Sequence, residues 1–321
     1  MIEASKVTKR RVSVSGVLKI LGVSRSGFLA FLCRKPTASQ LLKDEIKDKI
    51  LDIYNQSKQN YGAPKITREL QKAGYRISER TVGKYMQEIG IKAQWANHWT
   101  KTTKDSDFST EPHNILDEQF NPDRPNAVWC TDITYIWTFD GFVYLTSIMD
   151  LYARKIIAWT LSTTMEVSSV IDTINKAKEQ RNTSLPLIIH SDRGSQYVSQ
   201  AYRDATEKMC RSYSHKGYPY DNACIESFHS LIKREWLNRF KIYDYNHAYR
   251  LVFEYIETFY NTVRIHSHCD YMSPDQFEKL YQKWLHSRTT LCSACLPQTT
   301  DIKMRQWGSP AGVALAIDTD L

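Results

Sequence analysis

A predicted helix in residues 221–235, DNACIESFHSLIKRE, carries an acid, a base and two further polar groups on one face. Glu226, His229, Ser230 and Lys233 recur at helical intervals, so their side chains point the same way. The segment opens with residues typical of a good helix cap, and its adjoining face is apolar, as in a helix that packs on a core. Considered alone, this pattern favours an ordinary surface ion pair on an amphipathic helix.

Two further carboxylates lie beside predicted β-strands. Asp132 is inside the strand WCTDITYI, where a charge between apolar neighbours is costly unless it is paired or metal-bound. Asp192 follows the apolar run LPLIIHS, which is typical of a buried central strand. A strand interior, a strand end and a helix can bring Asp132, Asp192 and Glu226 to one sheet edge. Three acids there would repel one another unless divalent cations hold them.

Magnesium suits such a site because it accepts a few carboxylates and keeps other positions for water or phosphate oxygens. Two ions can activate an attacking oxygen and stabilise the leaving oxygen of a phosphodiester. We therefore expect two Mg²⁺ ions, with Mn²⁺ as a substitute, and Lys233 as a ligand for a DNA phosphate beside them. Each acid also has an ordinary explanation as a water-facing strand residue, a turn residue or half of an ion pair.

Other chemistries are disfavoured. Cys130 and Cys224 lack an obvious partnered base, which argues against a nucleophilic cysteine. The sequence has no glycine-rich phosphate loop, so a nucleotide-driven motor is not expected.

The elements that position these acids form a mixed α/β region, expected over residues 126–284. Three antiparallel strands are predicted at AVWCTDITYIWT, FVYLTSIMDL and KIIAWTLS, the first two joined by a turn at Asp140–Gly141. A helix is predicted over 167–180, and the strand LPLIIHSD and later helices follow it.

The N-terminal region, residues 1–94, is predicted to be all α-helical and to bind DNA. Two short helices surround a turn within 13–33, another helix covers 43–56, and a helix-turn-helix is expected over 61–91. Residues 1–104 hold 21 Lys and Arg against 8 Asp and Glu, a balance of +13 in a chain of net +8. Many helical hairpins bind nothing, but this charge favours a polyanionic partner. The candidates for DNA contact on the two helices of the motif are Lys65, Arg68, Arg80, Lys84 and Gln87.

The remaining segments are polar or without a recognised pattern. Residues 95–125 are expected to be a linker, and 285–321 a tail of unknown role. No run of eighteen apolar residues and no secretory signal are seen, so no membrane is expected. Seven scattered cysteines favour reduced thiols and a cytoplasmic setting.

At these motifs the sequence resembles the DDE transposases of bacterial insertion sequences, in particular the second-frame product of two-frame elements. The resemblance covers about residues 40–282 and is carried by VWCTDITYI, IIHSDRGSQYVS, SHKGYPYDNACIESFHSLIKRE and YIETFYNTVRIHSHCDYMSPDQF. It implies an RNase H-like, integrase-like core with Asp132, Asp192 and Glu226 as the metal-binding triad and Lys233 as the associated basic residue. The 33 residues between Asp192 and Glu226 are slightly fewer than is common in the family. The zinc-binding His/Cys module of retroviral integrases is absent from the sequence.

The expected function is therefore metal-dependent cleavage of the element's DNA ends and transfer of their 3′ hydroxyls into target DNA. Asp132 is expected to contact both magnesium ions, and Asp192 and Glu226 one each, without a covalent enzyme intermediate. Expected partners are the terminal repeats, target DNA and further copies of the chain on DNA, at the bacterial nucleoid. A first-frame transposase partner is left open. A structure-selective nuclease and a catalytically inactive DNA-binding repressor are the alternatives.

Overall fold

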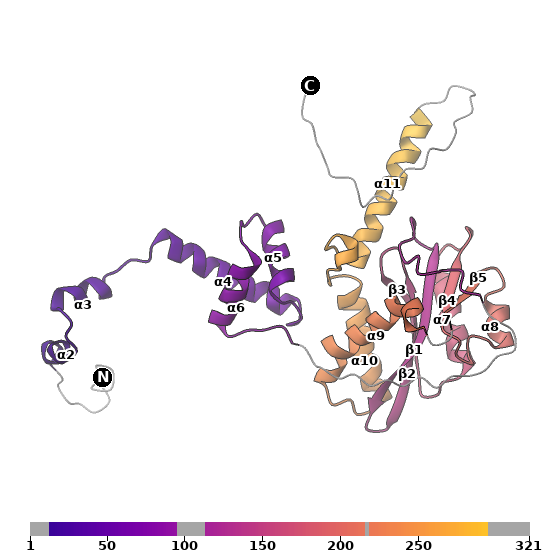
Figure 1. The fold of residues 1–321 in the computed structure, drawn as a ribbon, viewed down its shortest axis with the longest axis horizontal. Helices are drawn as coiled ribbons and strands as arrows, with labels where there is room; N and C mark the ends of the chain where they lie inside the picture. Colours follow the sequence, from indigo (N-terminus) through magenta and orange to yellow (C-terminus); the bar gives the residue numbers. More distant parts are fainter. Residues whose placement is uncertain (1–12, 95–112, 216–217, 295–321) are drawn as a thin grey trace.

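The computed structural model describes residues 13–94, 113–215 and 218–294. A chain of helices, α2 to α6, leads into a five-stranded sheet with its own helices, and the long helix α11 follows the sheet domain (Figure 1). Among the described helices, no single one is long and apolar enough to cross a membrane. Only α2 and α3 taken together, bent by 109°, pass the test of length and composition.

The first helices begin at capped serine and threonine positions. Helices α2 (Val14–Ile20) and α3 (Arg25–Leu32) flank a turn at Gly22, as predicted, and the Ser24 hydroxyl caps α3. Helix α4 (Ala38–Gln56) begins several residues before the predicted start because Thr37 and Gln40 form a capping box.

Helices α5 (Ala63–Lys72) and α6 (Glu79–Ile89) form the predicted helix-turn-helix. Gly74, at φ +92°, makes the turn after α5, and the Ser78 hydroxyl accepts from the backbone N–H of Thr81 at the start of α6. These helices pack on α4 around a small apolar core. Its fully buried members are Ile50, Ile66, Leu70 and Val82.

The sheet has the strand order β3-β2-β1-β4-β5. Its first three strands pair antiparallel, while β1 pairs parallel with β4, and β4 with β5. This mixed sheet, with helices on its faces, is the expected RNase H-like arrangement. The strands are β1 (Val128–Thr138), β2 (Gly141–Asp150), β3 (Lys155–Ser162), β4 (Ile188–Ser191) and β5 (Cys210–Tyr213).

Helices cover both faces of the sheet through two separate apolar clusters. The cluster under α9 and α10 includes Cys130 and Ile136 of β1, whereas the cluster under α7 and α8 includes Trp129 of the same strand. Alternate residues of β1 therefore face opposite helices. The helices are α7 (Val167–Gln180), α8 (Gln200–Ala205), α9 (Ala223–Glu235) and α10 (Tyr245–Tyr255); short helical turns occupy Pro219–Asn222, Leu237–Arg239, Ile256–Tyr260 and Ser267–Cys269.

The described end of the expected linker packs on the sheet domain. Leu116 is buried in the cluster under α9, and the backbone N–H groups of Ile115 and Leu116 donate to the Ser212 hydroxyl. Phe120 packs against the same cluster, and its carbonyl accepts from Arg154. Residues 95–112 lie outside the described part of the chain.

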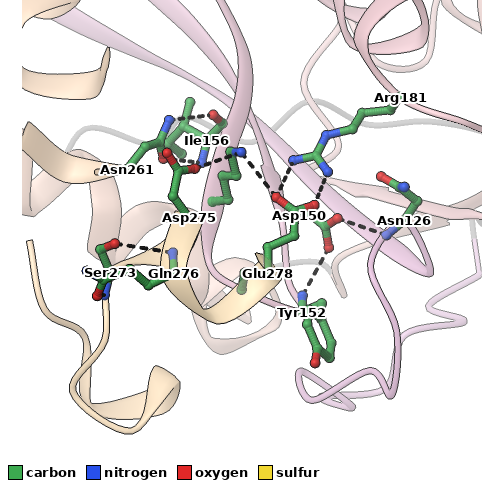
Figure 2. A network of polar contacts seen from close by, with 12 residues as sticks. Asn126, Asp150, Tyr152, Ile156, Arg181, Asn261, Ser273, Asp275, Gln276 and Glu278 are labelled. Carbon is green, nitrogen blue, oxygen red and sulfur yellow. Dashed lines mark hydrogen bonds and ion pairs between the residues drawn. The ribbon is translucent and has the colours of Figure 1, made fainter. Parts of the chain in front are cut away.

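A buried polar network anchors helix α11 (Pro274–Ala294) to the sheet domain (Figure 2). Glu278 of α11 pairs with Arg181, and Lys155 lies 2.7 Å from Asp275 and 3.1 Å from Glu278. Nearby, the Asp150 carboxylate accepts from two backbone N–H groups. Helix α11 continues past residue 284, where the core was expected to end.

The helix-turn-helix unit is docked on the sheet domain by polar contacts. The Tyr61 hydroxyl accepts from the backbone N–H of Ile265 at 2.8 Å, and the Lys58 ammonium lies 2.6 Å from Glu254. Directly beside this junction, Arg264 makes a bidentate pair with Glu235, both distances 2.7 Å. These contacts connect the C-terminal end of α9, at Glu235, to the α4–α6 unit. Glu226 lies in the first turn of the same helix.

Candidate active site

The register of two parallel strands brings two of the predicted acids together. Strands β1 and β4 pair at Cys130↔His190, and this is the last pair of that ladder. Asp132 lies two residues further along β1, and Asp192 is the first residue after β4, two residues beyond His190. Neighbouring strands are about 4.8 Å apart, so both acids lie just beyond the open end of this ladder.

Asp132 is held from two sides. Its Oδ1 accepts from the backbone N–H of Ile133 at 2.8 Å, and its Oδ2 lies 3.3 Å from Nδ1 of His229 on α9. The other ring nitrogen of His229 is 2.7 Å from the hydroxyl of Ser147, which is the cross-strand partner of Asp132 on β2. The buried imidazole of His229 thus contacts both members of one cross-strand pair, Asp132 on β1 and Ser147 on β2.

Asp192 is half-buried in the tight turn after β4. Its Oδ1 accepts from the N–H of Gly194 at 2.9 Å, and a Cβ at Gly194 would approach the same oxygen to 3.0 Å. Burial raises the pKa of the Asp192 carboxyl to about 6, and the charges of Asp132 and Glu226 add to this rise. The Asp192 carboxyl therefore experiences the negative charge of both other acids.

Helix α9 brings the third acid over the sheet. Its apolar residues Ile225 and Phe228 are buried in the cluster on β1, while the Glu226 side chain is exposed. Partial burial and the charge of Asp132 raise the pKa of the Glu226 carboxyl. The expectation of a capped start is wrong: the Asn222 side chain makes no capping bond, and its amide donates instead to the Thr131 carbonyl on β1 at 3.5 Å.

Lys233 lies two turns beyond Glu226 on the same helix. Its ammonium is 4.3 Å from the centroid of the Tyr135 ring on β1. Burial lowers the pKa of Lys233, and the charge of Asp132 opposes this shift. The site therefore combines three acids and one cation at the open end of the β1–β4 ladder.

Two family models match the parts of the chain that build this site, and a third matches the helical region. The integrase core domain models match residues 122–216 and 208–274, and an HTH-like domain model matches residues 41–99. The chain is 36% identical over 248 residues to the transposase for insertion sequence element IS904 of Lactococcus lactis, covering 77% of this chain and 98% of that protein. It is 33% identical over 270 residues to the transposase InsF for insertion sequence IS3A of Escherichia coli, covering 83% and 94%.

The chain belongs to the insertion-sequence transposases. Membership of this family implies polynucleotidyl transferase activity in general terms. Solved structures with similar folds include the simian T-cell lymphotropic virus intasome in complex with PP2A regulatory subunit B56 gamma, at 14% identity and a TM-score of 0.42, covering 71% of this chain and 74% of that one. The HTLV-2 integrase catalytic core in complex with magnesium is similar at 16% identity and a TM-score of 0.37, covering 48% and 97%.

The acids of this transposase suit a hard divalent cation by their chemistry. All three supply carboxylate oxygens, which Mg²⁺ prefers, and the pKa of Asp192 is raised first by burial and then by the negative charges of Asp132 and Glu226, which a cation would offset. Within residues 13–94, 113–215 and 218–294, however, no three acids, histidines or cysteines are arranged closely enough to hold an ion as they stand.

The predicted DNA-contact residues of the transposase lie on two helices, α6 and α5, and differ in exposure. Arg80, Lys84 and Gln87 are exposed on α6. Lys65 is only partly exposed: its ammonium lies 5.0 Å from the Tyr61 ring centroid, and burial together with Arg264 lowers the pKa of Lys65 to about 8. The fifth candidate, Arg68, is exposed, with its guanidinium 4.9 Å from the centroid of the Tyr271 ring.

His229 is the residue whose place in the site the sequence did not reveal. The helical spacing set it on the face of Glu226 and Lys233, but no role followed from that. Its contacts depend on the cross-strand pair Asp132↔Ser147 and on the position of α9 over that pair. The available signal was weak: one histidine a single turn after the acid.

Proposed function

We propose that this transposase cleaves the DNA ends of its element and joins their 3′ hydroxyls to target DNA, using Asp132, Asp192 and Glu226. The observation that carries the proposal is the pairing of Cys130 with His190 at the end of the β1–β4 ladder, because Asp132 and Asp192 each follow two residues after this pair. The charges of Asp132 and Glu226, which add to the effect of burial on the pKa of Asp192, support the placement of the three carboxylates in one site.

The three acids are proposed to hold two magnesium ions, and Mn²⁺ is expected to substitute. When bound, the ions supply activation of the attacking oxygen and stabilisation of the leaving oxygen in an in-line displacement. The attacking groups are water in cleavage and the freed 3′ hydroxyl in joining. No side chain of the protein is expected to form a covalent intermediate with the DNA.

The other residues of the site have positioning roles in this proposal. His229 fixes Oδ2 of Asp132, while the N–H of Ile133 fixes Oδ1, so the carboxylate keeps one orientation. Gly194 leaves room for the Asp192 carboxylate and donates its N–H to it. Lys233 is a cation near Asp132 and is proposed to bind a phosphate of the strand being cut.

The helical region is proposed to recognise the terminal repeats. The exposed α6 side chains Arg80, Lys84 and Gln87 suit phosphate and base contacts, whereas Lys65 and Arg68 would act nearer the junction with the sheet domain. Because two ends have to be cut together, at least two copies are expected to assemble on DNA, in the cytoplasm at the nucleoid. Assaying the chain both alone and fused to a first-frame product tests whether that product is a required partner.

The test is a cleavage and joining assay on labelled element-end DNA with a supercoiled target. Purified chain, alone and fused to the product of the preceding frame, is incubated with Mg²⁺, Mn²⁺ or EDTA. Metal-dependent nicks at the 3′ ends and joined products are the expected result. Cleavage that never yields joints would support a structure-selective nuclease instead. Tight end binding with no cleavage by either form would support an inactive repressor.

A further inference from the structure

The hairpin of β1 and β2 extends beyond the strands on either side of it (Figure 1). On the β4 side, β1 pairs only over Val128–Cys130, although the strand continues to Thr138. On the β3 side, the pairing of β2 with β3 begins at Tyr144↔Ser162. The outer part of the hairpin, residues 136–143, is therefore a two-stranded ribbon, and the stretch of β1 between Asp132 and this ribbon has no partner strand on the β4 side.

One face of this ribbon is aromatic and open to solvent. The exposed fractions are 36% for Tyr135, 54% for Trp137 and 51% for Phe142. The residues that alternate with them along β1, Ile136 and Thr138, are buried on the opposite face. Trp137 and Phe142 are cross-strand partners, and the rings of Tyr135 and Phe142 meet edge to face with centroids 5.5 Å apart. Large aromatic side chains on a protruding, uncovered face indicate a binding surface.

The aromatic face continues from the ribbon onto the segment before α10. Phe139, 57% exposed, contacts Trp137 with ring centroids 4.9 Å apart and stacks on Tyr243 at 5.7 Å. Backbone bonds hold this arrangement, since the N–H of Phe139 donates to the Ile242 carbonyl and that of Asp140 to the Tyr243 carbonyl. We call the surface made by Tyr135, Trp137, Phe139, Phe142 and Tyr243 the aromatic ribbon face.

The inner end of the aromatic ribbon face meets Lys233, the cation of the candidate site. The Lys233 ammonium lies 4.3 Å from the Tyr135 ring centroid, and the charge of Asp132 acts on the same ammonium. A strand whose phosphate is bound by Lys233 would thus have its next bases beside Tyr135 and the rings beyond it. Exposed aromatic rings that line the path of a DNA strand are suited to stacking on bases without regard to sequence.

We propose that the aromatic ribbon face binds unpaired bases of the DNA strand that enters the active site. This inference rests on the proposed function, because that function is what brings a DNA strand to Asp132. Holding bases out of the duplex would keep the cut strand open at the acids. The Lys233 ammonium beside Tyr135 supplies the positive charge that a nucleic acid backbone requires next to its stacked bases.

The test measures binding of fluorescein-labelled single-stranded oligodeoxyadenylate and of a matched duplex by anisotropy, in EDTA, so that it does not depend on cleavage. Three variants of the full chain are compared with the wild type. Trp137→Ala/Phe142→Ala removes two rings, and Trp137→Tyr/Phe142→Tyr retains stacking. Phe253→Ala is the matched control, since Phe253 is 47% exposed on α10 and lies outside the aromatic ribbon face.

The double alanine variant is expected to bind the single strand about tenfold more weakly, with duplex binding unchanged, because each stacked base contributes appreciably. The double tyrosine variant and Phe253→Ala are expected to stay close to the wild type. Equal single-strand affinity of the double alanine variant and the wild type would overturn the inference. So would a shift of the double alanine variant from dimer to monomer in sedimentation with unchanged affinity, which would identify a contact between copies.

The same proteins are then tested for cleavage, which separates this inference from the function on which it rests. If the wild type cleaves DNA and the double alanine variant binds single strands normally, the inference about the aromatic ribbon face is wrong and the proposed function stands. If the wild type never cleaves but the tenfold loss of binding is present, the proposed function is wrong and the aromatic ribbon face remains a single-strand binding surface.

Discussion

His229 on α9 lies 3.3 Å from the Asp132 carboxylate on β1, and its opposite ring nitrogen is 2.7 Å from the Ser147 hydroxyl on β2. A helix one layer away thus fixes the orientation of an acid in the middle of a strand. With the proton on Nδ1, the ring donates toward Asp132 and accepts from the Ser147 hydroxyl. Such a partner is what keeps a metal-binding carboxylate in one rotamer.

Replacing His229 is therefore expected to weaken metal binding without unfolding the protein. His229→Ala should lower Mn²⁺ affinity and cleavage by about 10- to 100-fold, as loss of the residues behind metal ligands generally does. His229→Asn, which keeps a donor, should recover part of this loss. Calorimetric Mn²⁺ titration and cleavage rates measure both effects, with Ser230→Ala on the exposed side of α9 as the control. Unchanged Mn²⁺ affinity in His229→Ala would contradict the role.

Asp192→Asn is expected to stabilise the metal-free protein while abolishing cleavage. The folded-state pKa of Asp192 is raised from 3.8 to about 6 by burial and by the other two acids, so the folded chain holds this proton more tightly than the unfolded chain. The resulting stability is present at low pH and declines as the pH rises through this range. At neutral pH in EDTA the amide should raise the free energy of unfolding by about 1–2 kcal/mol.

Urea unfolding at neutral pH and at about pH 5 checks the sign of this effect. The gain in Asp192→Asn should be smaller at the lower pH, where the native carboxyl is largely protonated. A variant less stable than the wild type at neutral pH would show that the three acids do not repel one another.

The Arg264–Glu235 pair is expected to be important for stability because both side chains are largely buried. Arg264→Ala leaves Glu235 without its bidentate partner and should lower the free energy of unfolding by about 3–5 kcal/mol. Arg264→Met with Glu235→Leu should restore much of that loss, since neither partner of the pair is then left as an unpaired charge. Urea denaturation of the three proteins makes the comparison. A double variant no more stable than Arg264→Ala would assign the loss to packing instead.

Lys84 is expected to contact DNA phosphate from the exposed side of α6. Lys84→Ala should weaken binding of end DNA and reduce the slope of log affinity against log salt by about 1, because one fewer counterion is released. Lys176→Ala, exposed on α7, is the matched control and should leave the slope unchanged. Anisotropy titrations across a salt series give both slopes. Identical slopes for Lys84→Ala and the wild type would exclude a phosphate contact.

Local patterns in the sequence were sufficient for most elements of the fold. The predicted helix over 167–180 is α7, and KIIAWTLS is β3, without a shift at either end. Both are set by residues next to one another in the chain, such as the β-branched run of β3. The strand predicted at LPLIIHSD is shorter, because only Ile188–Ser191 find pairing partners on β1 and β5.

What the sequence did not predict depends on contacts between distant segments. The position of Asp132 and Asp192 just beyond the same end of the β1–β4 ladder follows from the pairing of Cys130 with His190, which no local pattern encodes. The Asn222 side chain, expected near a capped helix start, turns instead to the Thr131 carbonyl. The packing of Leu116 under α9 likewise depends on a neighbour far away in the chain, so that stretch resembled a linker.

The most direct test of the account compares Asp132→Asn, Asp192→Asn and Glu226→Gln with two control variants. The controls, Asp172→Asn and Glu179→Gln, change exposed acids of α7 away from the site. Cleavage and joining of labelled end DNA are measured in Mn²⁺. Each of the three site variants is expected to lose both reactions, while both controls retain them. Retention of wild-type cleavage by any one of the three would show that its carboxylate is not part of the catalytic site.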